Sequence, residues 1–116
     1  MMEQASGFFK LLSEPVRLRL VALLMDGESH CVCDLVSVLG LPQSTVSRHL
    51  SLLRNGGLVL AERQGTWMHY RLNPDLSDWQ RQALEAVRQL KATDDQLRRD
   101  DAALNQALCS KGGCTG

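Results

Sequence analysis

Apolar residues recur every three or four positions through the first half of the chain, and short stretches rich in glycine, proline or polar residues interrupt them. Such spacing is typical of amphipathic helices. Pro15 is tolerated in a first helical turn, where its missing N–H is not needed, and Asp26-Gly27 ends the run that follows it. The pattern predicts helices at about 6–12, 15–25, 32–39 and 43–54.

Gly40-Leu41-Pro42 separates the last two of these helices, and two short helices joined by such a turn are typical of a helix-turn-helix motif. The face of the second helix that lies opposite Val46 carries hydroxyl groups and a guanidinium, which suit contact with a DNA groove. A polar face that is merely solvated is the alternative. His49 lies near the apolar side, placed either to contact phosphate or to pack. The predicted DNA-binding residues of this helix are Gln43, Ser44, Thr45, Ser47, Arg48, His49 and Ser51.

Two segments rich in β-forming residues, 58–63 and 67–72, follow that helix, and the second alternates apolar and polar side chains as a strand does. A hairpin directly after a helix-turn-helix predicts a wing. Arg63 and Gln64 lie near its tip, where they are expected to contact the DNA backbone or the minor groove. A hairpin that only closes the core is the alternative.

A long apolar stripe begins at Leu76 and continues at three- and four-residue steps, more weakly beyond residue 91, to Leu108. It predicts a long helix from about residue 75. An apolar stripe of this length has to be buried against another surface. We expect that surface to be a second copy of the chain in a two-fold dimer; packing of the helix onto its own domain is the alternative. The predicted organisation is a DNA-binding and dimerisation domain at 1–108 and a flexible tail with cysteine and glycine at 109–116.

Length and composition fit a single globular domain, with 116 residues of which 44% are hydrophobic. We find neither a membrane-spanning stretch nor an opening like a signal peptide, and so expect a cytoplasmic protein with no membrane partner and with reduced thiols. The formal net charge is zero, but residues 43–71 contain four arginines against the single acid Glu62. A basic middle of this kind favours contact with phosphates.

Cys31 and Cys33 stand one residue apart at the predicted start of the third helix. In a reducing compartment a Cys-X-Cys pair more often offers two thiolates to a soft ion, or serves as a redox pair, than forms a structural disulfide. A helix start also favours the thiolate. Buried packing is the alternative. We expect the neighbouring His30 to be an exposed helix-start residue rather than a ligand.

Three motifs in order resemble the ArsR/SmtB family and its arsenic-responsive repressors: His30-Cys31-Val32-Cys33-Asp34-Leu35, Gln43 to Leu50, and Arg63 to Leu72. The resemblance runs from about residue 8 to residue 79. It implies a mainly α fold with a β-hairpin, a winged helix-turn-helix that dimerises through its terminal helices. It further implies a homodimeric repressor that leaves double-stranded operator DNA when As(III) or Sb(III) binds its thiolates, with no organic cofactor.

The thiol motif departs from the family pattern at Val36, where well-known members have a third cysteine, and at His30, where a leucine is common. Cys109 and Cys114 are therefore predicted as further metal ligands, and a small thiol such as glutathione is another source of a third sulfur. The histidine and carboxylate site of zinc-sensing members looks absent. Because helical residues two apart point about 200° away from each other, we expect metalloid binding to unwind the first turn of the third helix and to shift the recognition helix.

Other functions use the same residues. The thiols could sense Cd(II), Pb(II), Zn(II) or redox state on the same DNA-binding fold. An intracellular arsenic carrier or a thiol enzyme such as a small arsenate reductase belongs to another class. We see no phosphate-cradling loop beside a cysteine nucleophile, and so do not expect an enzyme. A carrier leaves the polar helix face and the wing unexplained.

Overall fold

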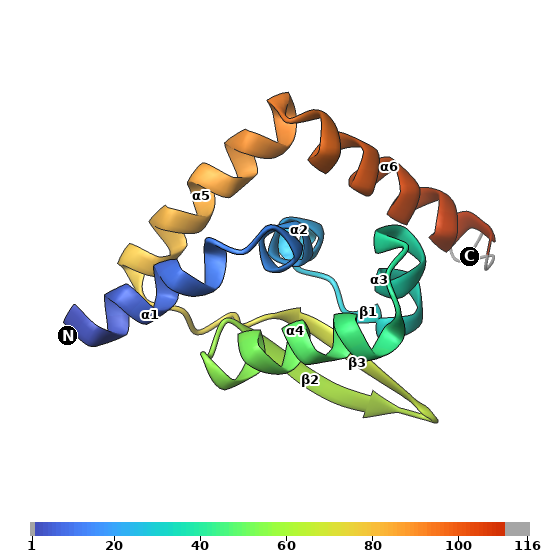
Figure 1. The fold of residues 1–116 in the computed structure, drawn as a ribbon, viewed down its shortest axis with the longest axis horizontal. Helices are drawn as coiled ribbons and strands as arrows, with labels where there is room; N and C mark the ends of the chain where they lie inside the picture. Colours follow the sequence, from blue (N-terminus) through green and yellow to red (C-terminus); the bar gives the residue numbers. More distant parts are fainter. Residues whose placement is uncertain (1, 111–116) are drawn as a thin grey trace.

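The chain forms a mostly helical body with a β-hairpin along one side, in a computed structural model that describes residues 2–110 (Figure 1). The elements are α1 (Met2–Leu12), α2 (Pro15–Leu23), the short 3-10 turn η1 (Leu24–Asp26), β1 (His30–Cys31), α3 (Val32–Leu39), α4 (Gln43–Asn55), β2 (Val59–Gln64), β3 (Trp67–Leu72), α5 (Asp78–Thr93) and α6 (Asp95–Ser110). None of the helices in these residues is long and apolar enough to cross a membrane.

The predicted helices of the first half are confirmed, although α1 begins four residues earlier than its apolar run suggested. Glu14 caps α2 by accepting the Arg17 backbone N–H at 3.0 Å, and Pro15 occupies the first helical position. Gly40 ends α3 with a positive φ of 67°, which a residue with a Cβ rarely adopts. The α3–α4 turn is thus as tight as the sequence predicted.

The hairpin is part of a three-stranded antiparallel sheet in the order β1-β3-β2. β2 and β3 pair from Val59–Leu72 to Gln64–Trp67, as the alternation predicted. β1 was not predicted, because two residues are too short to show a period; it adds the segment before α3 to the outer edge of β3. The sheet therefore joins the Cys-X-Cys motif to the wing.

One hydrophobic core lies between the helices and the inner face of the sheet. Its fully buried side chains come from α2, α3, α4 and the start of the hairpin, and include Leu20, Leu35, Val46, Leu50 and Leu58, each 0% exposed. Burial of several leucines of this size stabilises the domain by about 2 kcal/mol each. The same packing fixes α4 against α2 and α3, so its polar side faces outward.

The predicted single long C-terminal helix is wrong: the backbone is extended at Asp94, which separates α5 from α6. The Asp94 carboxylate accepts the Leu97 N–H at 3.0 Å and so caps α6. The α6 helix turns back and packs on α2 and α3, where Leu97 and Leu104 are 4% and 2% exposed (Figure 1). The second half of the stripe is therefore covered by its own domain.

The predicted domain boundary after residue 108 falls inside α6, which continues to Ser110. Cys109 belongs to this last helical turn, and residues 111–116, with Cys114, lie outside the described residues.

Candidate functional site

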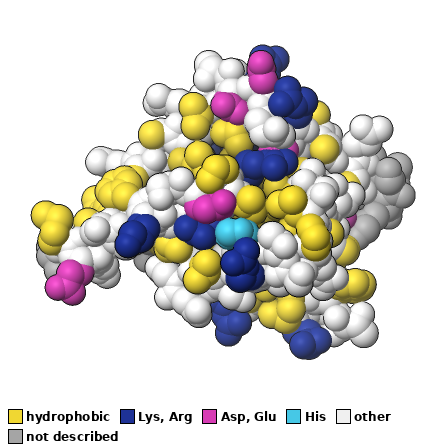
Figure 2. Space-filling model, in the orientation of Figure 1, with side chains coloured by type: hydrophobic (Ala, Val, Ile, Leu, Met, Phe, Trp, Pro, Cys, Tyr) yellow, Lys and Arg dark blue, Asp and Glu magenta, His cyan; other side chains and the backbone are white. Residues whose placement is uncertain are grey.

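The outward side of α4 carries the side chains predicted to contact DNA. Val46, Leu50 and Leu53 face the core, each 0% exposed. On the other side, Gln43, Ser44, Arg48 and Ser51 are exposed, and Thr45 and Ser47 are half-buried at its margins. Figure 2 shows Lys and Arg side chains spread over this face of the molecule, some of them in its lower part, where α4 and the hairpin lie in Figure 1. The outward side of α4 thus carries short hydroxyl side chains and one cation, on a helix that the major groove of DNA can admit.

The wing tip projects beyond the helical body (Figure 1). Arg63 and Gln64 are exposed at the end of β2, and Gly65 makes the turn with a φ of 66°. A hairpin held on one side by the core and exposed on the other can reach the DNA backbone beside α4. The predicted wing residues thus lie at the predicted place.

The predicted contact of His49 with DNA is not supported, because its side chain is 7% exposed and faces α2. The Arg17 guanidinium lies 3.2 Å from its Nδ1, and the Glu14 carboxylate lies 3.8 Å from the same atom. Of the two predicted roles, packing is the one the structure supports. His49 therefore links α4 to α2 and does not belong to the outward side of α4 that carries the other predicted contacts.

Burial lowers the pKa of His49; the Glu14 carboxylate opposes this shift, and the charges of Arg48 and Arg17 add to it. The unfolded chain therefore takes up a proton at His49 as the pH falls below the ordinary value of 6.5, before the folded chain does. The free energy of unfolding should fall as the pH drops through that window. Urea unfolding between about pH 7.5 and 5.5 measures the slope, which His49→Gln should flatten. Equal slopes for His49→Gln and the wild type would contradict this prediction.

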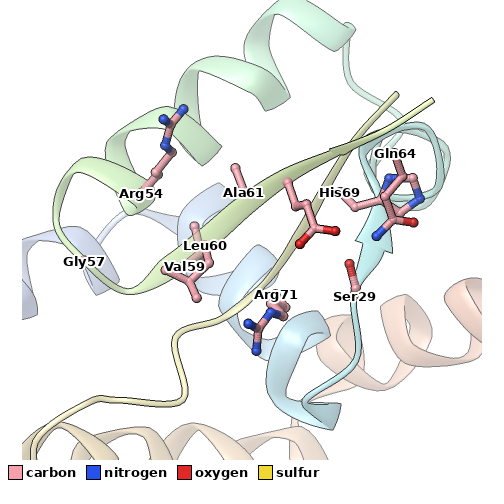
Figure 3. A pocket seen from close by; sticks show the side chains of 10 residues that line it. Ser29, Arg54, Gly57, Val59, Leu60, Ala61, Gln64, His69 and Arg71 are labelled. Atoms are coloured by element: carbon pink, nitrogen blue, oxygen red, sulfur yellow. The ribbon is translucent and has the colours of Figure 1, made fainter. Parts of the chain in front are cut away.

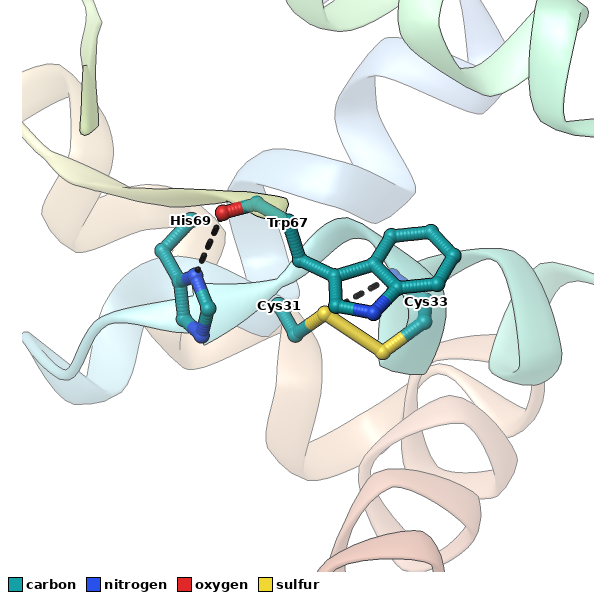
Figure 4. Close-up of a disulfide and its surroundings, with 4 residues drawn as sticks. All are labelled: Cys31, Cys33, Trp67 and His69. Carbon is teal, nitrogen blue, oxygen red and sulfur yellow. Dashed lines mark hydrogen bonds between the residues drawn. A yellow bond between two sulfur atoms is a disulfide. The ribbon is translucent and has the colours of Figure 1, made fainter. Parts of the chain in front are cut away.

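Cys31 and Cys33 meet at the start of α3. Cys31 is the N-cap, with extended backbone (φ −63°, ψ 139°), and its Sγ accepts the Cys33 N–H at 3.3 Å. The structure pairs the two cysteines as a disulfide, with Cα atoms 5.2 Å apart (Figure 4). The sequence favoured two free thiolates, whereas the structure shows the oxidised pair that a redox couple would form. The expectation that helix unwinding must bring the sulfurs together is wrong, because Cys31 lies outside the helix.

The thiol pair also touches the wing. Cys31 is the antiparallel partner of His69. Figure 4 shows the His69 ring to the left of Cys31 and the Trp67 indole overlying the two sulfurs in this view. The His69 Nδ1 lies 3.3 Å from the Trp67 carbonyl oxygen, which orients the imidazole. Sequence reasoning missed both neighbours, since the pairing of a two-residue strand leaves no signal in the sequence.

His30 is not the exposed residue that the sequence predicted. Its side chain is 3% exposed on the inner face of the sheet, opposite Tyr70. The Nε2 atom lies 2.8 Å from the Asp26 carboxylate, and the buried Nδ1 has no hydrogen-bond partner among the described residues. Because neighbouring strand residues point to opposite faces, His30 points away from the side on which Cys31 lies.

Two sulfurs are a donor set that suits a soft, thiophilic ion. Among residues 2–110, no group of three or more His, Cys, Asp or Glu side chains is placed to hold a metal ion. Val36, at the position of the missing cysteine, is half-buried against the core. The end of α6, where Cys109 lies, is beside α3 (Figure 1), and Cys114 is outside the described residues. The site as described supplies two of the three thiolates that trivalent arsenic prefers.

A helix pair joined by a tight turn, a polar outer face on the second helix and a hairpin beside it define a winged helix-turn-helix, the fold of a large class of DNA-binding transcriptional regulators. Residues 14–60 match the sequence model described as bacterial regulatory protein, arsR family. The arsenic resistance transcriptional regulator ArsR2 of Pseudomonas putida KT2440 is 42% identical over 81 residues, which cover 70% of each chain. The chain belongs to the arsR family.

Further relatives agree with this assignment. The arsenical resistance operon repressor of Escherichia coli K12 is 48% identical over 71 residues, so the chain spans 61% of that relative's length. The solved structure of HlyU from Vibrio cholerae has a TM-score of 0.69 and 28% identity, covering 79% of this chain and 96% of that one. A homodimeric winged helix-turn-helix domain from Mycobacterium bovis has a TM-score of 0.62 and 29% identity, covering 80% and 87%.

Proposed function

We propose that this chain is a cytoplasmic, homodimeric repressor that binds double-stranded operator DNA and leaves it when As(III) or Sb(III) binds Cys31 and Cys33. The observation that carries the proposal is the position of the thiol pair, at the N-cap of α3 and in register with the wing strand β3. The helix that supports α4 and the strand that forms the wing thus meet at the two sulfurs.

The proposed DNA contacts come from the exposed side of α4 and from the wing tip. Ser44, Arg48 and Ser51 would enter the major groove, while Arg63 and Gln64 would contact backbone or minor groove. Exposed apolar side chains on the terminal helices support a dimer: Phe9 of α1 and Leu90 of α5 are 52% and 41% exposed. A two-fold dimer would present two α4 helices to a palindromic operator.

The chemistry of release requires the reduced pair. Two thiols react with As(OH)₃ so that two S–H and two As–O bonds break and two As–S bonds form, with loss of two waters and no change in oxidation state. The ion would replace the Cys33 N–H contact on Cys31 Sγ and would sit between α3 and β3. Because α3 packs on both α4 and β3, an ion that favours another arrangement of the α3 start would weaken DNA binding.

The test is retention of a labelled operator by the reduced protein, measured by fluorescence anisotropy. Arsenite and antimonite should each release the DNA, and equal concentrations of Cd(II), Pb(II) and Zn(II) should release less. Retention with both metalloids, alongside release by one of the divalent ions, would contradict the proposed inducer while keeping the repressor.

A redox switch is the second candidate, because the structure pairs Cys31 with Cys33 as a disulfide. In that case peroxide would release the operator without any metalloid, and a dithiol would restore binding. An effect of peroxide that persists in Cys31→Ser would exclude this pair as the switch.

Arg48→Ala should weaken operator binding about tenfold and lower the salt dependence, since one phosphate or base contact is lost. The arsenite affinity should not change, because Arg48 lies on the opposite side of α4 from the core packing. Anisotropy titrations at two salt concentrations measure both effects. Arg98→Ala, an exposed cation on α6, is the matched control. Equal losses in the two variants would remove Arg48 from the interface.

A further inference from the structure

An open hollow of about 490 Å³ lies on the outer face of the wing sheet, which points away from the hydrophobic core (Figure 3). Its walls come from β2, β3, the end of α4 and the segment before β1. The volume falls within the range of about 300–1,000 Å³ that is typical of small-molecule sites. The main contacts of α6 are with α2, α3 and α5, so that helix leaves this face of the sheet open.

The strand register places the hollow directly beside the thiols. Cys31, His69 and Glu62 form one row across β1, β3 and β2, because His69 pairs with both of the others. Ser29 directly precedes β1, and Arg71 follows Tyr70, the strand partner of His30. Ser29, Glu62, His69 and Arg71 all line the hollow. Cys31 does not line the hollow itself, but it is the strand partner of His69, which does.

The charges around the hollow fit a ligand with more than one carboxylate and an ammonium group. Arg54, from the end of α4, Arg71, from β3, and the carboxylate residue Glu62 all line the hollow. Figure 3 shows the Arg54 and Arg71 guanidiniums pointing to opposite sides of it. All three side chains are exposed, and none of them takes part in an ion pair within the described residues. Guanidiniums bind carboxylates through charge-assisted, often bidentate hydrogen bonds.

We propose that this hollow holds a small anionic thiol of the glutathione class, and that its sulfur is the third ligand of arsenic bound to Cys31 and Cys33. This inference rests on the proposed function. Arg54 and Arg71 would bind the two carboxylates and Glu62 the ammonium group. In the closing step the thiol S–H and the last As–OH bond break, an As–S bond and water form, and the oxidation state of arsenic does not change.

A small thiol bound in the hollow would supply the third sulfur ligand that a cysteine at position 36 would otherwise provide. With two protein sulfurs at the site, a third bond would raise the affinity for arsenic, and a built carboxylate site would raise the local thiol concentration. Cys109 and Cys114, predicted as additional ligands, are the competing source. The two sources of the third sulfur can be distinguished, because a ligand from the tail cysteines requires no added small thiol.

The experiment uses the full chain and the tail double variant Cys109→Ser/Cys114→Ser, both kept reduced by a phosphine that is not a thiol. Arsenic-edge X-ray absorption counts the sulfur ligands with phosphine alone, with glutathione, or with 2-mercaptoethanol. S-methylglutathione, which keeps the carboxylates but lacks the thiol, is added as a competitor. A Trp79→Phe background leaves Trp67, beside the two sulfurs, as the fluorescent reporter of arsenite affinity.

The tail double variant should show two sulfurs with phosphine alone and three with glutathione. Glutathione should raise the arsenite affinity about tenfold and act at a lower concentration than 2-mercaptoethanol. Arg71→Gln or Arg54→Gln should remove most of that gain and leave the affinity in phosphine unchanged. The matched control is Arg63→Gln, whose side chain leaves β2 on the other face.

Three sulfurs in the full chain without added thiol, falling to two in the tail double variant, would overturn the inference and place the third ligand in the tail. The inference would also be overturned if glutathione and 2-mercaptoethanol raised the arsenite affinity at equal concentrations, or if glutathione raised it fully in Arg71→Gln. Either result would show that the hollow does not bind the carboxylates of the thiol. Failure of arsenite to release the operator in every arm would instead overturn the proposed function.

Discussion

Cys31→Ser and Cys33→Ser are each expected to keep operator affinity within about twofold of the wild type and to abolish release by arsenite. In the proposed mechanism the two thiols act as a chelate, in which the second As–S bond forms within one molecule at a high effective concentration. Loss of either sulfur should therefore cut the arsenite affinity by about 10²- to 10⁴-fold. The side of α4 that is proposed to contact DNA contains neither cysteine, and serine can still cap α3 at position 31.

Operator anisotropy against arsenite concentration measures this effect in the reduced proteins. The complementary variant Val36→Cys should have higher arsenite affinity that no longer depends on glutathione, because Val36 follows Cys33 by three residues on the same side of α3. Normal release by either serine variant would place the sensing site elsewhere in the chain.

Asp100→Ala should lower the free energy of unfolding by about 2–3 kcal/mol, somewhat less than the loss of one partner from a fully buried pair. Asp100 is 3% exposed and accepts two hydrogen bonds from Arg19, both at 2.9 Å, and one from Gln96 at 3.0 Å. The Asp100 hydrogen bonds raise the pKa of Arg19, although burial partly opposes that shift. The pair anchors α6 to α2. Because the Arg19 side chain is 22% exposed, water replaces part of what the variant loses.

Urea unfolding gives the change in free energy, and hydrogen exchange over residues 95–108 reports whether α6 detaches. Asp101→Ala is the matched control, because the Lys91–Asp101 pair is longer, at 3.4 Å, and Asp101 is 48% exposed; its loss should be below about 1 kcal/mol. Equal losses for both variants would show that Asp100 does not anchor the helix. A double-mutant cycle with Arg19→Ala measures the coupling directly.

The helix-turn-helix and the wing could be predicted because their signals are local. Apolar spacing placed Val46, Leu50 and Leu53 inward, and glycine at position 40 fixed the turn. His49 shows the limit of that reasoning. A residue at the margin of an apolar stripe faces in or out according to what packs there, and here Glu14 and Arg17 of another helix meet it.

The C-terminal stripe was visible in the sequence, but its partner was not. Spacing alone is the same for a helix that pairs with a second copy and for one that folds back. The fold-back depends on one extended residue, Asp94, and on the distant pair between Arg19 and Asp100. Neither leaves a periodic signal along the chain.

The sequence by itself determined two soft donors at Cys31 and Cys33 and a polar face on the helix that follows the turn, and the family resemblance marked Val36 as the position of a third thiol in other members. The donors and the polar face are properties of residue types at short spacing. Only the tertiary structure decided how the two sulfurs meet and what lies beside them. Pairing of β1 with β3 holds Cys31 extended at the N-cap, next to His69 and the hollow of the wing sheet. Contacts between strands nearly forty residues apart follow from packing of the whole chain, since a two-residue strand has no pattern of its own.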